Sequence, residues 1–266
     1  MNVALRNSQR EASVVPILPE RSDATAPHHL VTIHGIADTA DVWKQAVTKL
    51  TPQFRSYQQL SLKWHSEVGE PYAYPDPGAV LADAWRQLPD GPKVVVSHSF
   101  GCNALLSMAQ RQPLDDVDAL ILVSPYYKAG YEDFNWALFR RYVSEFERFL
   151  LSSIDVRMQG RALTEDARAT ILNRLMQSYS PPSWIMFFTN WTQTPTLTFQ
   201  NFKMPCLLAT GSEDFSILPG DVETLAGCLP DAEYRLLDGL GHFSLIEDPA
   251  FTATHINDFL QKRLYQ

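Results

Sequence analysis

The sequence is poor in cysteine and has no long apolar run. Its three cysteines, Cys102, Cys206 and Cys228, are odd in number and lack metal-ligand spacing, which argues against a disulfide framework or a zinc site and fits reduced thiols. The apolar run near the start, residues 14–18, is too short for a signal sequence or a membrane span. We therefore expect a cytoplasmic protein with no membrane partner.

Positive charge is also scarce. The 266 residues include 22 Lys and Arg against 30 Asp and Glu, a formal net charge of -8, so the chain has no broad attraction for nucleic acid. Apolar residues make up 45% of the sequence and no charged or Pro/Gly/Ser-rich linker divides it, which favours one large core. We expect no metal and no organic cofactor, and the oligomeric state is not predicted.

Short apolar runs rich in β-branched residues alternate with helix-length patterns along the chain. Such runs are typical of strands buried on both faces of a parallel sheet. They occupy residues 30–33, 93–97, 119–123 and 206–209, with weaker examples at 57–62 and 233–237. Helical patterns cover residues 41–50, 76–88, 100–112 and 249–262. The alternation predicts an α/β protein with a doubly wound, mostly parallel sheet.

The alternation stops between residues 128 and 203, where no buried-strand pattern occurs. Helical patterns cover residues 133–152, 165–177 and 182–193 instead, and Thr164 is expected to cap the second of them. A stretch this long without a strand does not fit a simple crossover between strands. We predict a core formed by residues 1–127 and 204–266 and an inserted helical cap formed by residues 128–203.

Ser99 stands where a predicted strand runs directly into a predicted helix. Ser97 and Gly101, two positions to either side, are small enough to let the strand and the helix pack closely. In such a turn the hydroxyl projects from the sheet beside a helix N-terminus, where amide groups and the helix dipole favour negative charge. The pattern predicts a nucleophile; an ordinary capping serine is the alternative, because Ser97 takes a position that is glycine in G-x-S-x-G.

Asp214 and His242 each follow a predicted strand, at residues 206–209 and 233–237. Open α/β sheets build their sites at the carboxyl ends of their strands, so these side chains are expected to meet Ser99. Taken singly, Asp214 could be a helix cap and His242 a surface loop residue. The chain order Ser, Asp, His favours a catalytic triad instead.

The dipeptide His34-Gly35 follows the strand predicted at residues 30–33. Glycine allows the loop to turn back toward Ser99, which makes the amide of Ile36 a candidate donor to an oxyanion. The amide of Phe100, at the start of the helix, is the second candidate. A chance His-Gly after a strand is the alternative.

These motifs make the chain resemble the α/β-hydrolase superfamily, especially its cap-bearing esterase, C–C hydrolase and haloperoxidase-like members. The matching stretches are His34-Gly35 with Trp43, residues 97–101, residues 210–214, and Gly241-His242 with Glu247 and Pro249. The resemblance implies an α/β-hydrolase sheet. Two departures stand out: residues 60–66 replace the usual Asp-x-x-Gly-x-Gly-x-Ser loop, and the segment before residue 30 is short for the customary opening hairpin.

The triad chemistry predicts hydrolysis through an acyl-enzyme, in which His242 accepts the proton of Ser99 while Ser99 attacks a carbonyl. We expect the substrate to be a carboxylic ester or thioester of an apolar or aromatic acyl group, either a small molecule or carrier-bound. C–C bond hydrolysis or acyl transfer on the same triad stays open. So does a ligand-binding module without turnover.

The predicted cap is dense in aromatic residues, which indicates an apolar pocket or simply the contact between cap and core. The substrate-binding candidates are Trp64, Trp136, Phe139, Trp184 and Phe188. The cap also carries Arg140, Arg141, Arg148 and Arg157. We expect these arginines on a solvated helix face, with an acidic carrier surface or a substrate carboxylate as the alternative.

Overall fold

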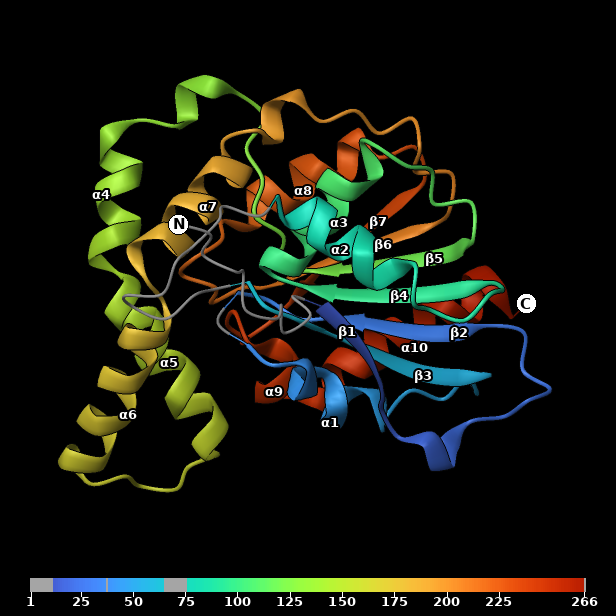
Figure 1. The fold of residues 1–266 in the computed structure, drawn as a ribbon, viewed down its shortest axis with the longest axis horizontal. Helices are drawn as coiled ribbons and strands as arrows, with labels where there is room; N and C mark the ends of the chain where they lie inside the picture. Colours follow the sequence, from blue (N-terminus) through green and yellow to red (C-terminus); the bar gives the residue numbers. More distant parts are fainter. Residues whose placement is uncertain (1–11, 37, 65–75, 266) are drawn as a thin grey trace, which may run out of the picture.

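The computed structural model describes residues 12–36, 38–64 and 76–265, and its centre is a sheet with helices on both faces (Figure 1). The described strands are β1 Ala12–Pro16, β2 His29–Ile33, β3 Ser56–Leu62, β4 Lys93–His98, β5 Val117–Val123, β6 Cys206–Gly211 and β7 Ala232–Leu237. Their order in the sheet is β1-β3-β2-β4-β5-β6-β7. All neighbouring pairs are parallel except β1 with β3.

The strand order places a topological switch between β2 and β4. From β2 the chain moves outward to β3, then crosses back to β4 and continues in the other direction to β7. The loops after β2 and β4 therefore leave the sheet side by side and diverge. Ligands of open α/β sheets bind at such a point, and the segments that follow β2 and β4 contain Gly35 and Ser99.

The strands are buried on both faces, which explains their unbroken apolar runs. Val95 belongs to one buried cluster and its neighbours Val94 and Val96 to the other, because successive side chains of a strand point to opposite faces. On one face lie α2 Pro77–Trp85, α3 Phe100–Ala109 and α8 Pro219–Cys228; on the other lie α1 Lys44–Val47, α9 Ser244–Glu247 and α10 Pro249–Leu264 (Figure 1).

All six predicted strands are present, and the predicted doubly wound, mostly parallel sheet is confirmed. The sequence did not predict β1, whose run ends in Pro16; this strand lies at the sheet edge, where proline is tolerated because no amide is needed there. It also missed α8 and α9. Residues 1–11 and 65–75 of the predicted core lie outside the described residues, so the unusual segment 60–66 is described only as far as Trp64.

Residues 128–203, which we call the insertion, connect β5 to β6 with helices and loops. Its helices are α4 Trp136–Ser144, α5 Phe146–Met158, α6 Glu165–Ser178 and α7 Pro181–Trp191. The helix predicted at 133–152 is thus divided at Glu145. Thr164 caps α6 as predicted, accepting a hydrogen bond from the amide of Ala167 at 3.2 Å. Figure 1 shows α4, α5 and α6 at one end of the sheet.

None of the helices within residues 12–36, 38–64 and 76–265 combines the length and the apolar surface that a membrane-spanning helix requires.

Two helical glycines offer a matched test of the packing between β2 and α3. A methyl group on Gly101 would lie 2.5 Å from the carbonyl oxygen of His34 and 2.8 Å from Cγ2 of Ile33, whereas one on Gly227 would meet nothing within 4 Å. We expect Gly101→Ala to lower the free energy of unfolding by about 1–3 kcal/mol through overpacking. Gly227→Ala should raise it by roughly 0.5–1 kcal/mol through helix propensity. Urea denaturation measures both; equal stabilisation by the two substitutions would contradict the close approach.

Candidate active site

Ser99 occupies a sharp turn between the last residue of β4 and the first residue of α3. Its backbone has φ 55° and ψ -129°, a conformation that residues other than glycine rarely adopt. The turn is fixed on both sides, because the Ser99 amide donates to the Val123 carbonyl at 2.8 Å and the Ser99 carbonyl accepts from the Cys102 amide at 2.9 Å. Such strain costs roughly 1–3 kcal/mol and is found at functional sites.

The loop after β2 lies directly against this turn. A Cβ on Gly35 would be 2.8 Å from the Cβ of Ser99 and 3.2 Å from its hydroxyl, so only glycine fits there. Ile36 follows in the same loop. Phe100 is the first residue of α3, and the first amides of a helix have no intrahelical acceptor. The backbone around Ser99 therefore comes from two loops at the switch point of the sheet.

The side chains of Ser99, His242 and Asp214 form a continuous hydrogen-bonded chain. The Ser99 hydroxyl lies 2.9 Å from Nε2 of His242, and Nδ1 of His242 lies 2.8 Å from Oδ2 of Asp214. All three residues are at most 5% exposed. Since the carboxylate accepts, Nδ1 carries the proton and Nε2 is free to accept from the hydroxyl. The structure thus brings together three groups that are far apart in the sequence.

Asp214 is oriented by its own loop. Its Oδ1 accepts hydrogen bonds from the Ser216 amide at 2.9 Å, the Ser216 hydroxyl at 2.8 Å and the Ile217 amide at 3.0 Å. Burial would raise the pKa of Asp214, but the charge and the hydrogen bond of His242, with hydrogen bonds from the side chains of Ser216 and Ser124, outweigh it and leave the pKa below its ordinary value. Ser216, whose hydroxyl also lies 3.0 Å from Nδ1 of His242, was not predicted from the sequence.

Glu247 fixes the loop that carries His242. Its carboxylate accepts from the amide of Gly241 at 2.5 Å and from the amide of Phe243 at 3.1 Å, one residue to either side of the histidine. In the sequence, Glu247 is recognisable only as part of a motif. Its position gives that motif a physical meaning, because a carboxylate at this spacing closes the turn around His242.

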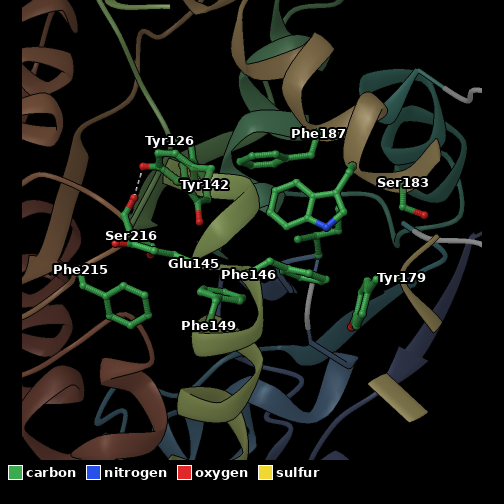
Figure 2. Close-up of a pocket in the computed structure, with 12 residues that line it drawn as sticks. Tyr126, Tyr142, Glu145, Phe146, Phe149, Tyr179, Ser183, Phe187, Phe215 and Ser216 are labelled. Carbon is green, nitrogen blue, oxygen red and sulfur yellow. Dashed lines mark hydrogen bonds between the residues drawn. The ribbon is translucent and has the colours of Figure 1, made fainter. Parts of the chain in front are cut away.

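An apolar pocket, whose roughly 560 Å³ of empty space includes open solvent, adjoins the side chains of Ser99, His242 and Asp214 (Figure 2). The described lining residues are Ile36, Tyr126, Tyr142, Glu145, Phe146, Phe149, Tyr179, Ser183, Trp184, Phe187, Phe215 and Ser216. The Tyr142 hydroxyl donates a hydrogen bond to the backbone carbonyl of Ser216 (Figure 2), and the ring of Tyr126 lies 6.0 Å from the ring of His242. The Phe149 ring lies 5.2 Å from the ring of His242. The pocket therefore opens beside the hydrogen-bonded chain.

Of the five aromatic residues predicted to bind substrate, Trp184 lines the pocket and four are not among the described lining residues. Trp136 is 75% exposed and Phe139 42% exposed, both on α4. Phe188 packs on Trp184, with ring centres 5.6 Å apart. Trp64 is buried behind the turn, where its indole donates to the His34 carbonyl at 3.1 Å. An aromatic-rich helix has several faces, and composition does not say which one meets the cavity.

Some of the lining residues that were not predicted from the sequence have a recognisable spacing. Tyr142, Phe146 and Phe149 follow one another at intervals of four and three residues, which is the spacing of one helical face. This spacing, rather than aromatic density, would have selected them.

Within residues 12–36, 38–64 and 76–265, no three histidine, cysteine or acidic side chains converge in an arrangement that could bind a metal ion.

Residues 30–255 match the Alpha/beta hydrolase family. The chain belongs to this family. The resemblance seen in the sequence is thereby confirmed, and family membership supports hydrolytic activity for this α/β hydrolase.

Solved structures show the same fold. An epoxide hydrolase from Bacillus megaterium superimposes with a TM-score of 0.67 at 15% identity, over 94% of this α/β hydrolase and 96% of the other chain. A thermophilic esterase from Thermogutta terrifontis gives a TM-score of 0.60 at 17% identity, over 94% and 93%. In sequence, Lipase LipV from Mycobacterium tuberculosis is 28% identical over 112 residues, which is 42% of each protein.

The lowered pKa of Asp214 predicts how stability depends on pH. The folded state binds this proton more weakly than the unfolded chain, whose ordinary value is 3.8, so Asp214 contributes stability above that value. The contribution is lost as the pH falls through the lower folded pKa. We expect the free energy of unfolding to decline below about pH 4, with a shallower decline in Asp214→Asn. Urea titrations between about pH 2 and pH 6 measure the slopes; an identical slope in the variant would contradict the assignment.

Proposed function

We propose that this protein is a serine hydrolase that cleaves carboxylic esters or thioesters of apolar or aromatic acyl groups through an acyl-enzyme. The observation that carries the proposal is the hydrogen-bonded chain from Ser99 through His242 to Asp214 beside an apolar pocket. No metal or organic cofactor takes part in this scheme.

In the proposed mechanism, Nε2 of His242 removes the proton from Ser99 as the hydroxyl oxygen attacks the substrate carbonyl. The resulting imidazolium then gives this proton to the leaving alkoxide or thiolate, and the acyl group stays on Ser99. Water, deprotonated by the same histidine, releases the acid. Asp214 remains ionised throughout and stabilises the imidazolium, a role that its lowered pKa supports.

We assign the oxyanion donors to the amides of Ile36 and Phe100. Two features support the assignment: the loop of Ile36 touches Ser99 through Gly35, and Phe100 begins α3, where the positive end of the helix dipole favours developing negative charge. One such donor contributes roughly 3 kcal/mol to stabilising the transition state.

The pocket supports an apolar or aromatic acyl group. Its lining is mostly aromatic, with Glu145 as the acidic member of the described set. Most of the lining residues come from the insertion, which supports the assignment of residues 128–203 as a cap over the core. The net charge of -8 argues against nucleic acid or an anionic membrane as a partner. We propose a small-molecule or carrier-bound substrate that the protein meets in the cytoplasm.

C–C bond hydrolysis and acyl transfer use the same three side chains, and a ligand-binding module without turnover has the same fold. A panel of p-nitrophenyl esters and acyl-CoA thioesters of graded chain length separates ester hydrolysis from thioester hydrolysis. Ester hydrolysis should dominate, and a preference for medium or aromatic acyl groups over acetate should follow from the apolar lining.

Removing the Ser99 hydroxyl tests the mechanism. We expect Ser99→Ala to lower kcat by about five to six orders of magnitude and to abolish labelling by a fluorophosphonate probe. Ser144→Ala, which removes an exposed serine of α4, should behave like the wild type. Labelling of Ser99→Ala at the wild-type rate would refute the nucleophile. A folded wild-type protein that neither reacts with the probe nor turns over any ester would favour the binding module.

Two tryptophans of the insertion test the pocket. Trp184 lines the cavity, whereas Trp136 is 75% exposed on α4. Trp184→Ala should lower kcat/KM for aromatic esters by about tenfold to thirtyfold, because about 2 kcal/mol of apolar contact is lost. Trp136→Ala should stay within about twofold of the wild type. Steady-state kinetics on acetate and benzoate esters distinguishes the two; equal effects would place the acyl group elsewhere.

A further inference from the structure

A second Asp–His pair is buried directly behind the proposed triad. Nδ1 of His98 lies 3.0 Å from Oδ2 of Asp38, and Nε2 of His98 lies 2.9 Å from the backbone carbonyl oxygen of His242. His98 is fully buried and the Asp38 side chain is 1% exposed. The rings of His98 and His242 are 5.0 Å apart. The proposed mechanism uses neither His98 nor Asp38.

The partners of His98 fix its protons. A carbonyl oxygen only accepts, so Nε2 must carry a hydrogen toward His242. Burial would raise the pKa of Asp38, but the hydrogen bond and charge of His98, with the charge of Arg157, outweigh it and hold the pKa below its ordinary value. The guanidinium of Arg157 on the other carboxylate oxygen independently favours an ionised Asp38, which can only accept, so Nδ1 of His98 carries the second hydrogen. His98 donates in both directions.

The other oxygen of Asp38 accepts a hydrogen bond from the guanidinium of Arg157, a residue of α5 in the insertion. The sequence predicted a solvated helix face for Arg157, and its side chain is 37% exposed, while its guanidinium also reaches the buried carboxylate of Asp38. The guanidinium also lies 5.7 Å from the ring centre of Phe243, and Phe149 on the same helix packs on His242 and Phe243 with ring centres 5.2 and 5.4 Å away. Helix α5 thus packs on the loop of the histidine.

Among the described residues, two more titratable groups interact electrostatically with Asp38. One is Tyr179, and the other is His34. Its ring nitrogens are engaged by the Gly35 carbonyl at 2.8 Å and the Leu62 amide at 3.1 Å. His98 and Arg157 are accordingly the side chains whose hydrogen bonds to Asp38 orient the carboxylate.

We infer that Arg157, Asp38 and His98 form a positioning chain that fixes the backbone of His242, and that Arg157 makes this chain depend on the packing of α5 against the core. The inference rests on the proposed function, because it assigns these residues to the placement of the general base. None of them touches the reacting atoms in this scheme. When α5 is packed, Asp38 orients His98, and His98 holds the carbonyl of the residue whose imidazole accepts the Ser99 proton.

The size of the effect on kcat distinguishes this positioning role from that of an ion pair that only stabilises the fold. A misplacement of about 1 Å in a catalytic group costs on the order of a hundredfold in rate, while an ion pair that only stabilises the fold leaves the rate of the folded protein unchanged. The expected signature is a fall in kcat with an unchanged KM for a short ester, since the pocket wall is intact.

Three variants test the positioning chain through kcat and stability together: Arg157→Met, Asp38→Asn and the double variant that combines them. Arg157→Met and Asp38→Asn should each lower kcat for p-nitrophenyl acetate by about tenfold, with KM within about twofold. Arg157→Met should also unfold more readily, because it removes a partner from a buried charge. The double variant carries no buried carboxylate at position 38. The double variant should therefore be more stable than Arg157→Met. Its kcat should stay at the level of the worse single variant, neither falling further nor returning toward the wild-type value.

Recovery of kcat together with stability would overturn the inference, as would losses that multiply to about a hundredfold in the double variant. Arg157→Lys, which keeps the charge and a donor, should restore kcat to within about threefold of the wild type. Arg168→Met is the control, since Arg168 pairs with exposed Asp155 within the insertion, and it should leave kcat unchanged.

A readout without turnover separates this inference from the proposed function. In ¹H–¹⁵N spectra of the imidazole groups, wild-type His98 should show two protonated ring nitrogens, and hydrogen exchange in the loop of residues 239–243 should speed up in Arg157→Met. Both effects should occur even if Ser99 proves not to be a nucleophile. A His98 ring with one protonated nitrogen in the wild type, or unchanged exchange in the variant, would overturn the positioning chain.

Discussion

The hydrogen bond between Ser99 and His242 joins two loops that are 143 residues apart in the chain, and the rest of the architecture serves to bring their ends together. Parallel strands make this possible, because their carboxyl ends all lie at one edge of the sheet. At the switch between β2 and β4, the loops that follow these two strands diverge from that edge. The close approach of Gly35 to Ser99 brings the backbones of the two loops together there. The strained turn at Ser99 persists because the strand and helix on either side over-determine it.

Burial of charge is the second constraint. Asp214 and Asp38 are both almost inaccessible, and desolvation alone would favour their neutral forms. Each remains ionised because several donors converge on it: two amides, a hydroxyl and His242 for Asp214, and His98 with Arg157 for Asp38. A site built this way is rigid, since moving any donor leaves a buried anion with fewer partners.

The sequence predicted those parts of the fold whose signal is local. Apolar runs marked β2, β4, β5 and β6, and small residues around Ser99 marked the turn, because each feature is decided by a few adjacent residues. Trp136, Phe139 and Phe188 are not among the described lining residues, because the rotation of α4 and α7 depends on tertiary packing. Trp64 is buried behind the turn of Ser99 instead. The pairing of His98 with Asp38 was missed because the two residues are 60 positions apart and only the fold brings them together. Ser216 contacts the neighbouring Asp214 locally, but its contact with His242, 26 positions away, also depends on the fold.

The insertion contributes to the site in two physically different ways. Its aromatic residues shape the cavity, and such contacts tolerate change because apolar packing is non-directional. Arg157, by contrast, supplies a directional charge to a carboxylate inside the core, and that contact exists only in one orientation of α5. Chains with the same sheet could therefore exchange the aromatic cavity wall more freely than Arg157, whose guanidinium hydrogen-bonds to the buried Asp38.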